Sequence, residues 1–180
     1  MSKKDIKLVA VGDGATGKTS LLTVLKGEPF PERYIPTIFE NYSQNYKQDD
    51  VNYELHIWDT PGQDEYDRLR PISYQDAKVI LLCFALDKRQ SFLNLSERWI
   101  MEVKYYCKDA RIILAGMKSD LRESGNPNHI SDEEARQFCI DQKFSEYVPC
   151  SAKTKDNVNR IFPSVVQACK EKKHGVCQLL

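Results

Sequence analysis

Residues 12–19 read Gly-Asp-Gly-Ala-Thr-Gly-Lys-Thr and combine the residue types that a phosphate-binding loop requires. Glycines let backbone N–H groups converge on an anion, because no Cβ blocks the turn. The helix expected from residue 20 begins with unpaired N–H groups that favour phosphate. Lys18 can place its ammonium on the β- and γ-phosphates, and the Thr19 hydroxyl suits Mg²⁺. We predict a nucleoside triphosphate site; the alternative is a glycine-rich turn, which the flanking apolar and helical runs disfavour.

A second polar stretch, Asp59-Thr60-Pro61-Gly62-Gln63, follows an expected strand. Asp59 is placed to serve Mg²⁺, generally through water. Gly62 can offer its backbone N–H to the γ-phosphate, and Gln63 can orient an attacking water because its amide both donates and accepts. Asp59 alone could be a solvated strand end, but the upstream loop favours the metal role. We therefore predict Gly62 and Gln63 as catalytic residues together with Lys18.

A proline-rich stretch over 26–41 reads as a loop and contains Thr37. Its hydroxyl could bind the metal while its N–H contacts the γ-phosphate, so that the loop is ordered only while this phosphate is present. The residues alone leave Thr37 as one of several candidate hydroxyls. We predict it as a third metal ligand and a catalytic residue.

Two later segments indicate which base is bound. Asp120 can accept hydrogen bonds from N1–H and the 2-amino group of guanine, donors that adenine does not offer together. The Ala152 N–H could bind guanine O6, and the Lys118 stem and the Phe30 ring could sandwich the base. Each fragment is weak alone, but their placement at successive strand ends indicates guanine.

Apolar and helical patterns alternate along the chain, which predicts an α/β fold in one domain. The expected sheet has six strands, mostly parallel with one antiparallel hairpin strand, and helices on both faces. Ligands bind such sheets at the carboxyl ends of the strands. Pro163 should kink the last helix or weaken its first turns. The expected strands are 6–11, 42–47, 51–58, 79–86, 111–117 and 147–150, and the expected helices after the first are 90–107, 131–142 and 157–173.

Composition excludes several classes of function. The 180 residues carry 26 basic and 26 acidic side chains, so no global field favours nucleic acid. The six cysteines have no C-x-x-C pairing, which predicts a reduced, cytoplasmic protein. We expect neither a signal peptide nor a membrane span, because no apolar stretch is long enough.

Taken together, the loop, 59–63, Lys118 with Asp120, and 151–153 resemble a small GTPase of the Ras superfamily. The segments 30–42 and 66–71 resemble the Rho family in particular, and the likeness runs from about residue 5 to residue 180. This resemblance implies a P-loop GTPase domain over 1–170. It also implies a switch that is active with GTP and inactive with GDP, with 27–42 and 59–72 as the switch regions.

The resemblance also implies partners and a set of nucleotide contacts. Effector proteins would bind 34–42, exchange factors would load GTP, GTPase-activating proteins would supply an arginine, and a dissociation inhibitor would bind the prenyl group of a monomer. The bound nucleotide would be GTP or GDP with Mg²⁺. The implied nucleotide-binding residues are Asp13, Gly14, Ala15, Thr16, Gly17, Lys18, Thr19, Ser20, Phe30, Tyr34, Pro36, Thr37, Asp59, Gly62, Lys118, Asp120, Ser151, Ala152 and Lys153.

Four departures from the family pattern carry expectations of their own. Met117 replaces Asn or Thr, so we expect weaker nucleotide affinity and faster GDP release. Pro61 replaces Ala and should stiffen the second switch region. Residues 121–130 contain Gly125 and Pro127, so the extra Rho helix should be absent. Arg33 could act as a built-in arginine finger, but a solvated loop charge is the favoured interpretation.

Residues 171–180 are expected to form a flexible basic tail. Cys177, followed by Gln178-Leu179-Leu180, fits geranylgeranylation, and the alternative is an ordinary tail with a free thiol. One lipid chain binds only marginally, so nearby lysines would help to hold the protein on anionic lipid at the cytoplasmic face of the plasma membrane.

Three functions remain open on the residues alone. The favoured one is a switch that hydrolyses GTP to GDP and phosphate. A GTP-binding scaffold with negligible hydrolysis is the second, because Pro61 and Met117 depart from the family pattern. An ATP-dependent enzyme is disfavoured by Lys118 and Asp120.

Overall fold

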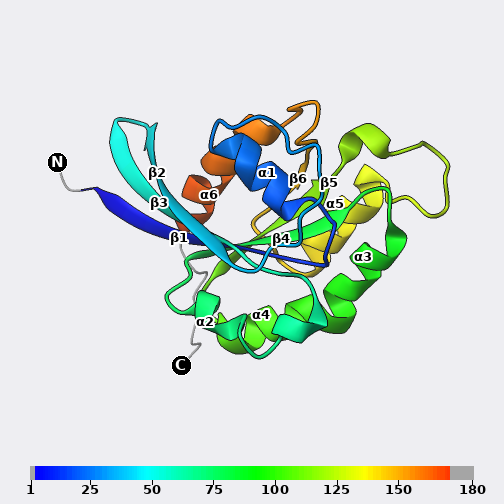
Figure 1. Ribbon diagram of the computed structural model, residues 1–180, viewed down its shortest axis with the longest axis horizontal. Coiled ribbons are helices and arrows are strands. Elements are labelled where there is room, and N and C mark those ends of the chain that lie inside the picture. The colour runs from blue at the N-terminus through cyan, green and yellow to red at the C-terminus, as the bar shows by residue number, and fades with distance from the viewer. Residues whose placement is uncertain (1–2, 171–180) are drawn as a thin grey trace, which may run out of the picture.

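The computed structural model describes residues 3–170, so Cys177 and the expected tail lie outside the described residues. Within this range six strands form one sheet in the order β2-β3-β1-β4-β5-β6 (Figure 1). Among the described pairs only β2 and β3 are antiparallel, which confirms the expected hairpin. The strands are β1 Lys4–Val11, β2 Glu40–Gln48, β3 Val51–Asp59, β4 Val79–Ala85, β5 Arg111–Met117 and β6 Glu146–Pro149.

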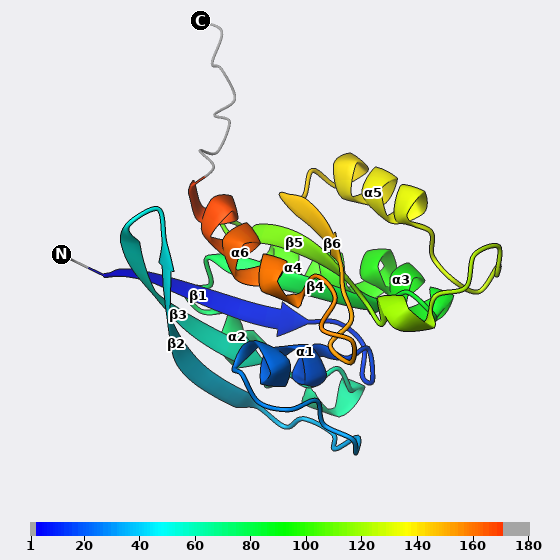
Figure 2. The same cartoon turned by 90° about the horizontal axis from the view of Figure 1, so that it is seen from above.

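Helices cover both faces of this sheet, as predicted (Figures 1 and 2). Alternate β1 side chains point to opposite faces: Leu8 and Ala10 pack in the cluster with α1 and α6, and Val9 and Val11 pack in the cluster with the other helices. Because β1, β3, β4, β5 and β6 run parallel, their carboxyl ends lie at the same edge of the sheet, and the loops after β1, β3, β5 and β6 can share one site. The helices are α1 Lys18–Leu25, α2 Pro71–Tyr74, α3 Arg89–Asn94, α4 Ile100–Tyr106, α5 Asp132–Asp141 and α6 Ile161–Lys170.

The helix expected over 90–107 is interrupted by a π-helical segment. Leu95–Trp99 joins α3 to α4 with i→i+5 hydrogen bonding. The apolar spacing of this region fits an ordinary helix, so the sequence did not reveal the wider turn. The segment places Trp99, which is fully buried, in the middle of the helix.

The last two helices begin at slightly different residues from those expected. Ser131 caps α5, since its Oγ accepts a hydrogen bond from the Glu134 N–H at 3.1 Å. The α-helix expected from residue 157 begins only at Ile161, after the 3₁₀ turn Val158–Arg160. Pro163 is therefore in the first turn of α6, where its missing N–H removes no intrahelical hydrogen bond.

The loop over 122–130 contains no α-helix, in agreement with the expected loss of the extra helix. Arg89 holds this loop: its Nε donates to the Pro127 carbonyl at 2.7 Å, and its Nη2 donates to the His129 carbonyl at 2.8 Å. Glu134 accepts two further hydrogen bonds from the same guanidinium. None of the helices in residues 3–170 has the length and apolar character that a membrane span needs.

Candidate nucleotide-binding site

The glycine-rich loop lies between β1 and α1 and depends on its glycines. Gly12 and Gly17 have φ angles of 140° and 108°, which side chains rarely tolerate. A Cβ on Gly12 would also lie 2.1 Å from the Cys83 carbonyl oxygen of β4. The loop is therefore folded tightly onto the sheet, with the start of α1 directly behind it.

Lys18 is buried and directed into this loop. Its Nζ donates to the carbonyl of Gly12 at 2.7 Å and to that of Asp13 at 2.8 Å. Burial lowers the pKa of Lys18, and nearby Cys83 and Asp59 oppose that shift. The carbonyl oxygens hold the ammonium where an anion bound by the loop would meet it.

Three hard oxygen donors converge beside Lys18 from separate segments. The hydroxyls of Thr19 and Thr37 are in direct contact, and the Thr37 Oγ1 lies 3.5 Å from Asp59 Oδ2. Asp59 Oδ1 is buried and, among the described residues, has no hydrogen-bond partner. Burial raises the pKa of Asp59, while Thr19 and Lys18 favour its charged form. An orphaned carboxylate oxygen beside two hydroxyls fits a Mg²⁺ ion.

Gly62 lies directly against the glycine-rich loop. A Cβ at this position would lie 2.2 Å from the Gly14 nitrogen, so only glycine allows the two backbones to approach this closely. Gln63 follows, and its Nε2 lies 3.5 Å from the Tyr34 hydroxyl. A Cβ on Gly14 would lie 3.9 Å from Gln63 Cδ, which is an ordinary contact, so only a side chain larger than that of alanine would crowd Gln63.

Except for Phe30 of the proline-rich loop, the residues predicted to bind the base come from the loops after β5 and β6. Asp120 Oδ1 accepts a hydrogen bond from the Ser151 hydroxyl at 2.5 Å, and the Ser119 N–H donates to the Cys150 carbonyl at 3.1 Å. These two contacts hold the loops together. Burial raises the pKa of the Cys150 thiol to about 12, which keeps it neutral.

A pocket of about 490 Å³ joins the phosphate end to the base end. Most of the predicted nucleotide-binding residues line it, and Arg33 lines it as well. The predicted residues outside its lining are Asp13, Thr16, Asp59, Asp120, Ser151, Ala152 and Lys153. The pocket residues that the sequence did not single out for binding are Thr23, Pro31, Glu32, Ile35, Glu40 and Thr60. These additional residues mostly belong to or flank the proline-rich loop, whose fold no local pattern indicates.

Met117 packs beneath the loop. It is 2% exposed, and its side chain lies 3.8–3.9 Å from the point where a Cβ on Gly17 would stand. The departure from the family pattern therefore replaces a polar side chain with core packing at this position.

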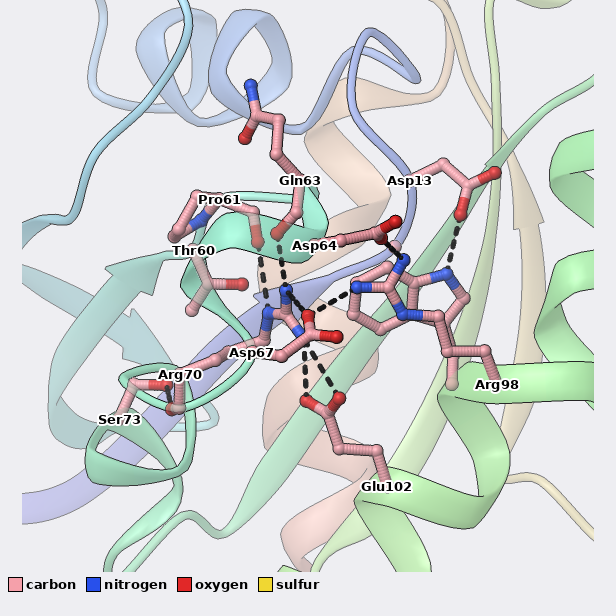
Figure 3. Close-up of polar contacts among 12 residues, drawn as sticks. Asp13, Thr60, Pro61, Gln63, Asp64, Asp67, Arg70, Ser73, Arg98 and Glu102 are labelled. Atoms are coloured by element: carbon pink, nitrogen blue, oxygen red, sulfur yellow. Dashed lines mark hydrogen bonds and ion pairs between the residues drawn. The ribbon is translucent and has the colours of Figure 1, made fainter.

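Arg70 holds the segment that carries Gln63, and the sequence did not single it out. This fully buried guanidinium donates to the carbonyls of Pro61 at 3.0 Å and Gln63 at 3.1 Å (Figure 3). It also pairs with Glu102 of α4 and with Asp67. Pro61 thus contributes its carbonyl to the segment, in addition to the fixed φ expected of proline.

Comparison with known proteins agrees with the geometry. The Ras family model matches residues 7–171. The chain is similar to Rho-related GTP-binding protein RhoB of Homo sapiens, at 42% identity over 178 residues that cover 94% of this chain and 91% of that protein. RhoB of Mus musculus and of Rattus norvegicus match at the same identity and coverage.

Proposed function

The chain belongs to the Ras family of small GTPases, within its Rho group, and on this premise we propose how its own residues bind GTP and hydrolyse it. The family supplies the activity: a molecular switch that binds guanine nucleotides. The observation that carries the residue assignment is the meeting of Thr19, Thr37 and Asp59, from three segments, beside the buried Lys18.

Hydrolysis is an in-line attack of water on the γ-phosphate, and each residue has a stated part. Lys18 and the backbone N–H groups of the loop stabilise the charge that spreads over the phosphate oxygens. Gln63 orients the water, and Gly62 supplies an N–H to the γ-phosphate. Thr19, Thr37 and Asp59 would hold Mg²⁺, which neutralises phosphate charge when bound.

Guanine is selected by the loops after β5 and β6, next to Lys118, which lines the pocket. The Asp120 carboxylate accepts from N1–H and the 2-amino group, and the contact with Ser151 supports its orientation. Lys118 and Phe30, which both line the pocket, enclose the base plane. The Ala152 N–H is assigned to guanine O6.

Four measurements test this proposal. Nucleotide released from the purified protein should be GDP or GTP, and chelation of Mg²⁺ should accelerate its release. Multiple-turnover phosphate release then distinguishes a hydrolysing switch from a scaffold that only holds GTP. Lys18→Ala should abolish guanine-nucleotide retention, and retention at the unchanged level would contradict the assignment.

The partners follow from the exposed first switch region. Tyr34, Ile35 and Ile38 are 65%, 75% and 65% exposed, although all three are large and mostly apolar. We assign residues 34–42 to effector binding in the GTP state. Exchange factors and GTPase-activating proteins would act on both switch regions, 27–42 and 59–72. The GTPase-activating proteins would supply an arginine.

We assign Cys177 as the site of a geranylgeranyl group that brings the protein to the cytoplasmic face of the plasma membrane. The support is the residue pattern from Cys177 to Leu180 and the nearby lysines. A dissociation inhibitor would bind the same lipid. Cys177→Ser should leave the protein in the soluble fraction, and unchanged sedimentation with membranes would place the anchor elsewhere.

A further inference from the structure

The π-helical segment brings together two side chains that an α-helix would separate. Asn94 and Trp99 are five positions apart, and in an α-helix of about 3.6 residues per turn they would point in clearly different directions. In the i→i+5 pattern they share one face. Asn94 Nδ2 donates to Asp13 Oδ2 at 2.7 Å, and Trp99 Nε1 donates to Asp13 Oδ1 at 2.7 Å. Asn94, the last residue of α3, and Trp99, the last residue of the π-helical segment, thus bind the two carboxylate oxygens of one residue in the glycine-rich loop.

The same indole contacts the residues that hold the Gln63 segment. The guanidinium carbons of Arg70 and Arg98 lie 4.6 Å and 4.4 Å from its centroid. Arg98 donates to Asp64 and to Asp67, each at 2.5 Å (Figure 3). The Trp99 side chain therefore contacts both the glycine-rich loop, through Asp13, and the two arginines that hold the segment after β3.

Arg70 is fixed in its orientation. Its five N–H donors have five acceptor contacts: two to Glu102, one to Asp67 and one each to the Pro61 and Gln63 carbonyls. A buried guanidinium with every donor satisfied has little freedom to rotate. Its position therefore sets the backbone on both sides of Gly62.

We propose that Trp99 is a positioning residue for hydrolysis, which sets the place of Gln63 relative to the phosphates through Asp13 on one side and Arg70 on the other. The inference rests on the proposed role of Gln63 in orienting water. The π segment has a function in this account, because it turns Trp99 and Asn94 toward the same carboxylate. Small displacements of a catalytic group have large effects on rate.

The chain offers a matched control, because it has two tryptophans. Trp99→Phe removes the N–H and keeps an aromatic ring next to the two arginines. Trp58→Phe makes the same change on β3, where the ring lies under Lys7 at 4.2 Å. In single-turnover hydrolysis by GTP-loaded protein, we expect Trp99→Phe to be slower by about tenfold or more and Trp58→Phe to match the wild type. Asn94→Ala removes the other hydrogen bond to Asp13 with little change in the core, and it should also slow hydrolysis. This variant tests the proposal if Trp99→Phe does not fold.

A double variant separates positioning from a general loss of stability. If Trp99 acts through Gln63, Trp99→Phe should have no further effect on hydrolysis by Gln63→Leu. An equal slowing in both backgrounds would overturn the proposal, as would wild-type hydrolysis by both folded, loaded Trp99→Phe and Asn94→Ala proteins.

A readout without hydrolysis separates this proposal from the proposed function. In Trp58→Phe the sole tryptophan is Trp99, so its emission reports the contact with Arg70. We expect the emission to differ between protein loaded with GDP and protein loaded with a non-hydrolysable GTP analogue. If the wild type releases no phosphate, the proposed function fails, and identical emission in the two states would overturn the link between Trp99 and the switch segment.

Discussion

The sulfur of Met117 lies 3.7 Å from the sulfur of Cys150, and this contact closes the core beneath the nucleotide pocket. Both residues are almost completely buried: Met117 is the last residue of β5, and Cys150 directly follows the neighbouring strand β6. A methionine here fills space by packing. It offers no strong hydrogen bond to the glycine-rich loop above it or to a bound base.

Met117→Asn should slow the release of GDP. One new neutral hydrogen bond, worth about 0.5–1.5 kcal/mol, would slow dissociation by roughly two- to tenfold, and a second would multiply that factor by about as much again. The measurement is the dissociation rate of a fluorescent GDP analogue in excess unlabelled GDP. Met117→Leu keeps the apolar packing and should release GDP at nearly the wild-type rate. An unchanged rate in Met117→Asn would mean that this position does not limit affinity.

Gly62→Ala should impair hydrolysis much more than nucleotide binding. The added carbon would lie 2.2 Å from the Gly14 nitrogen, so the backbone that carries Gln63 must move away. We expect single-turnover hydrolysis to fall by about a hundredfold. Guanine-nucleotide retention should persist, because Lys18 and Asp120 are untouched.

Gly14→Ala is the matched comparison for that variant. Its new carbon makes only ordinary contacts, at 3.9 Å, with Gln63 Cδ and the Tyr34 hydroxyl. It should retain more hydrolysis than Gly62→Ala, whereas the larger side chain of Gly14→Val should stall the reaction. If Gly14→Ala were the slower of the two alanine variants, the close approach of Gly62 would not control the rate.

The parts of the candidate site that could be predicted from the sequence are those that local chemistry determines. The glycine-rich loop, Asp59 and Asp120 each follow a strand with a distinct apolar pattern, and the parallel sheet brings strand ends together whatever the helices do. The order of the elements along the chain and the antiparallel hairpin follow from the same patterns.

The contacts between distant segments could not be predicted in this way. Asp13 and Trp99 are 86 positions apart, and Arg70 and Glu102 are 32 apart. Nothing in their local surroundings indicates that they meet. The π-helical segment Leu95–Trp99 could not be predicted either, because the apolar spacing around it fits an ordinary α-helix. The sequence shows that Met117 departs from the family pattern, but it does not predict the packing of Met117 against Gly17, which depends on how β5 lies under the loop.

Asp132→Asn should destabilise the protein at neutral pH but not in acid. A hydrogen bond from Arg122 is the main cause that lowers the pKa of Asp132, and the Tyr147 hydroxyl adds another. A lowered pKa means that the carboxylate stabilises the fold above its unfolded pKa of about 3.9, and that this contribution is lost as the pH falls through the folded value.

Urea unfolding at pH 7, 5, 4 and 3 measures this difference. We expect the variant to be less stable by about 1 kcal/mol at pH 7 and 5. The difference should shrink below about pH 4, where the wild-type carboxyl becomes neutral as well. A difference that stays constant down to pH 3 would assign the effect to shape instead of charge.

Arg89→Lys tests what stabilises the loop over 122–130, which stands where the extra helix was expected to be absent. The guanidinium joins the carbonyls of Pro127 and His129 to the Glu134 carboxylate, and lysine cannot reproduce this forked set of contacts. We expect the free energy of unfolding to fall by about 1–3 kcal/mol and the loop over 122–130 to be cleaved faster by protease. GDP release should be unchanged, because residues 122–130 include none of the residues assigned to the nucleotide. Arg136→Lys makes the same exchange in α5, outside this set of contacts, so it is the matched control and should alter neither property. Faster GDP release in Arg89→Lys would show instead that the shortened loop supports the base-binding segment through Ser119–Leu121.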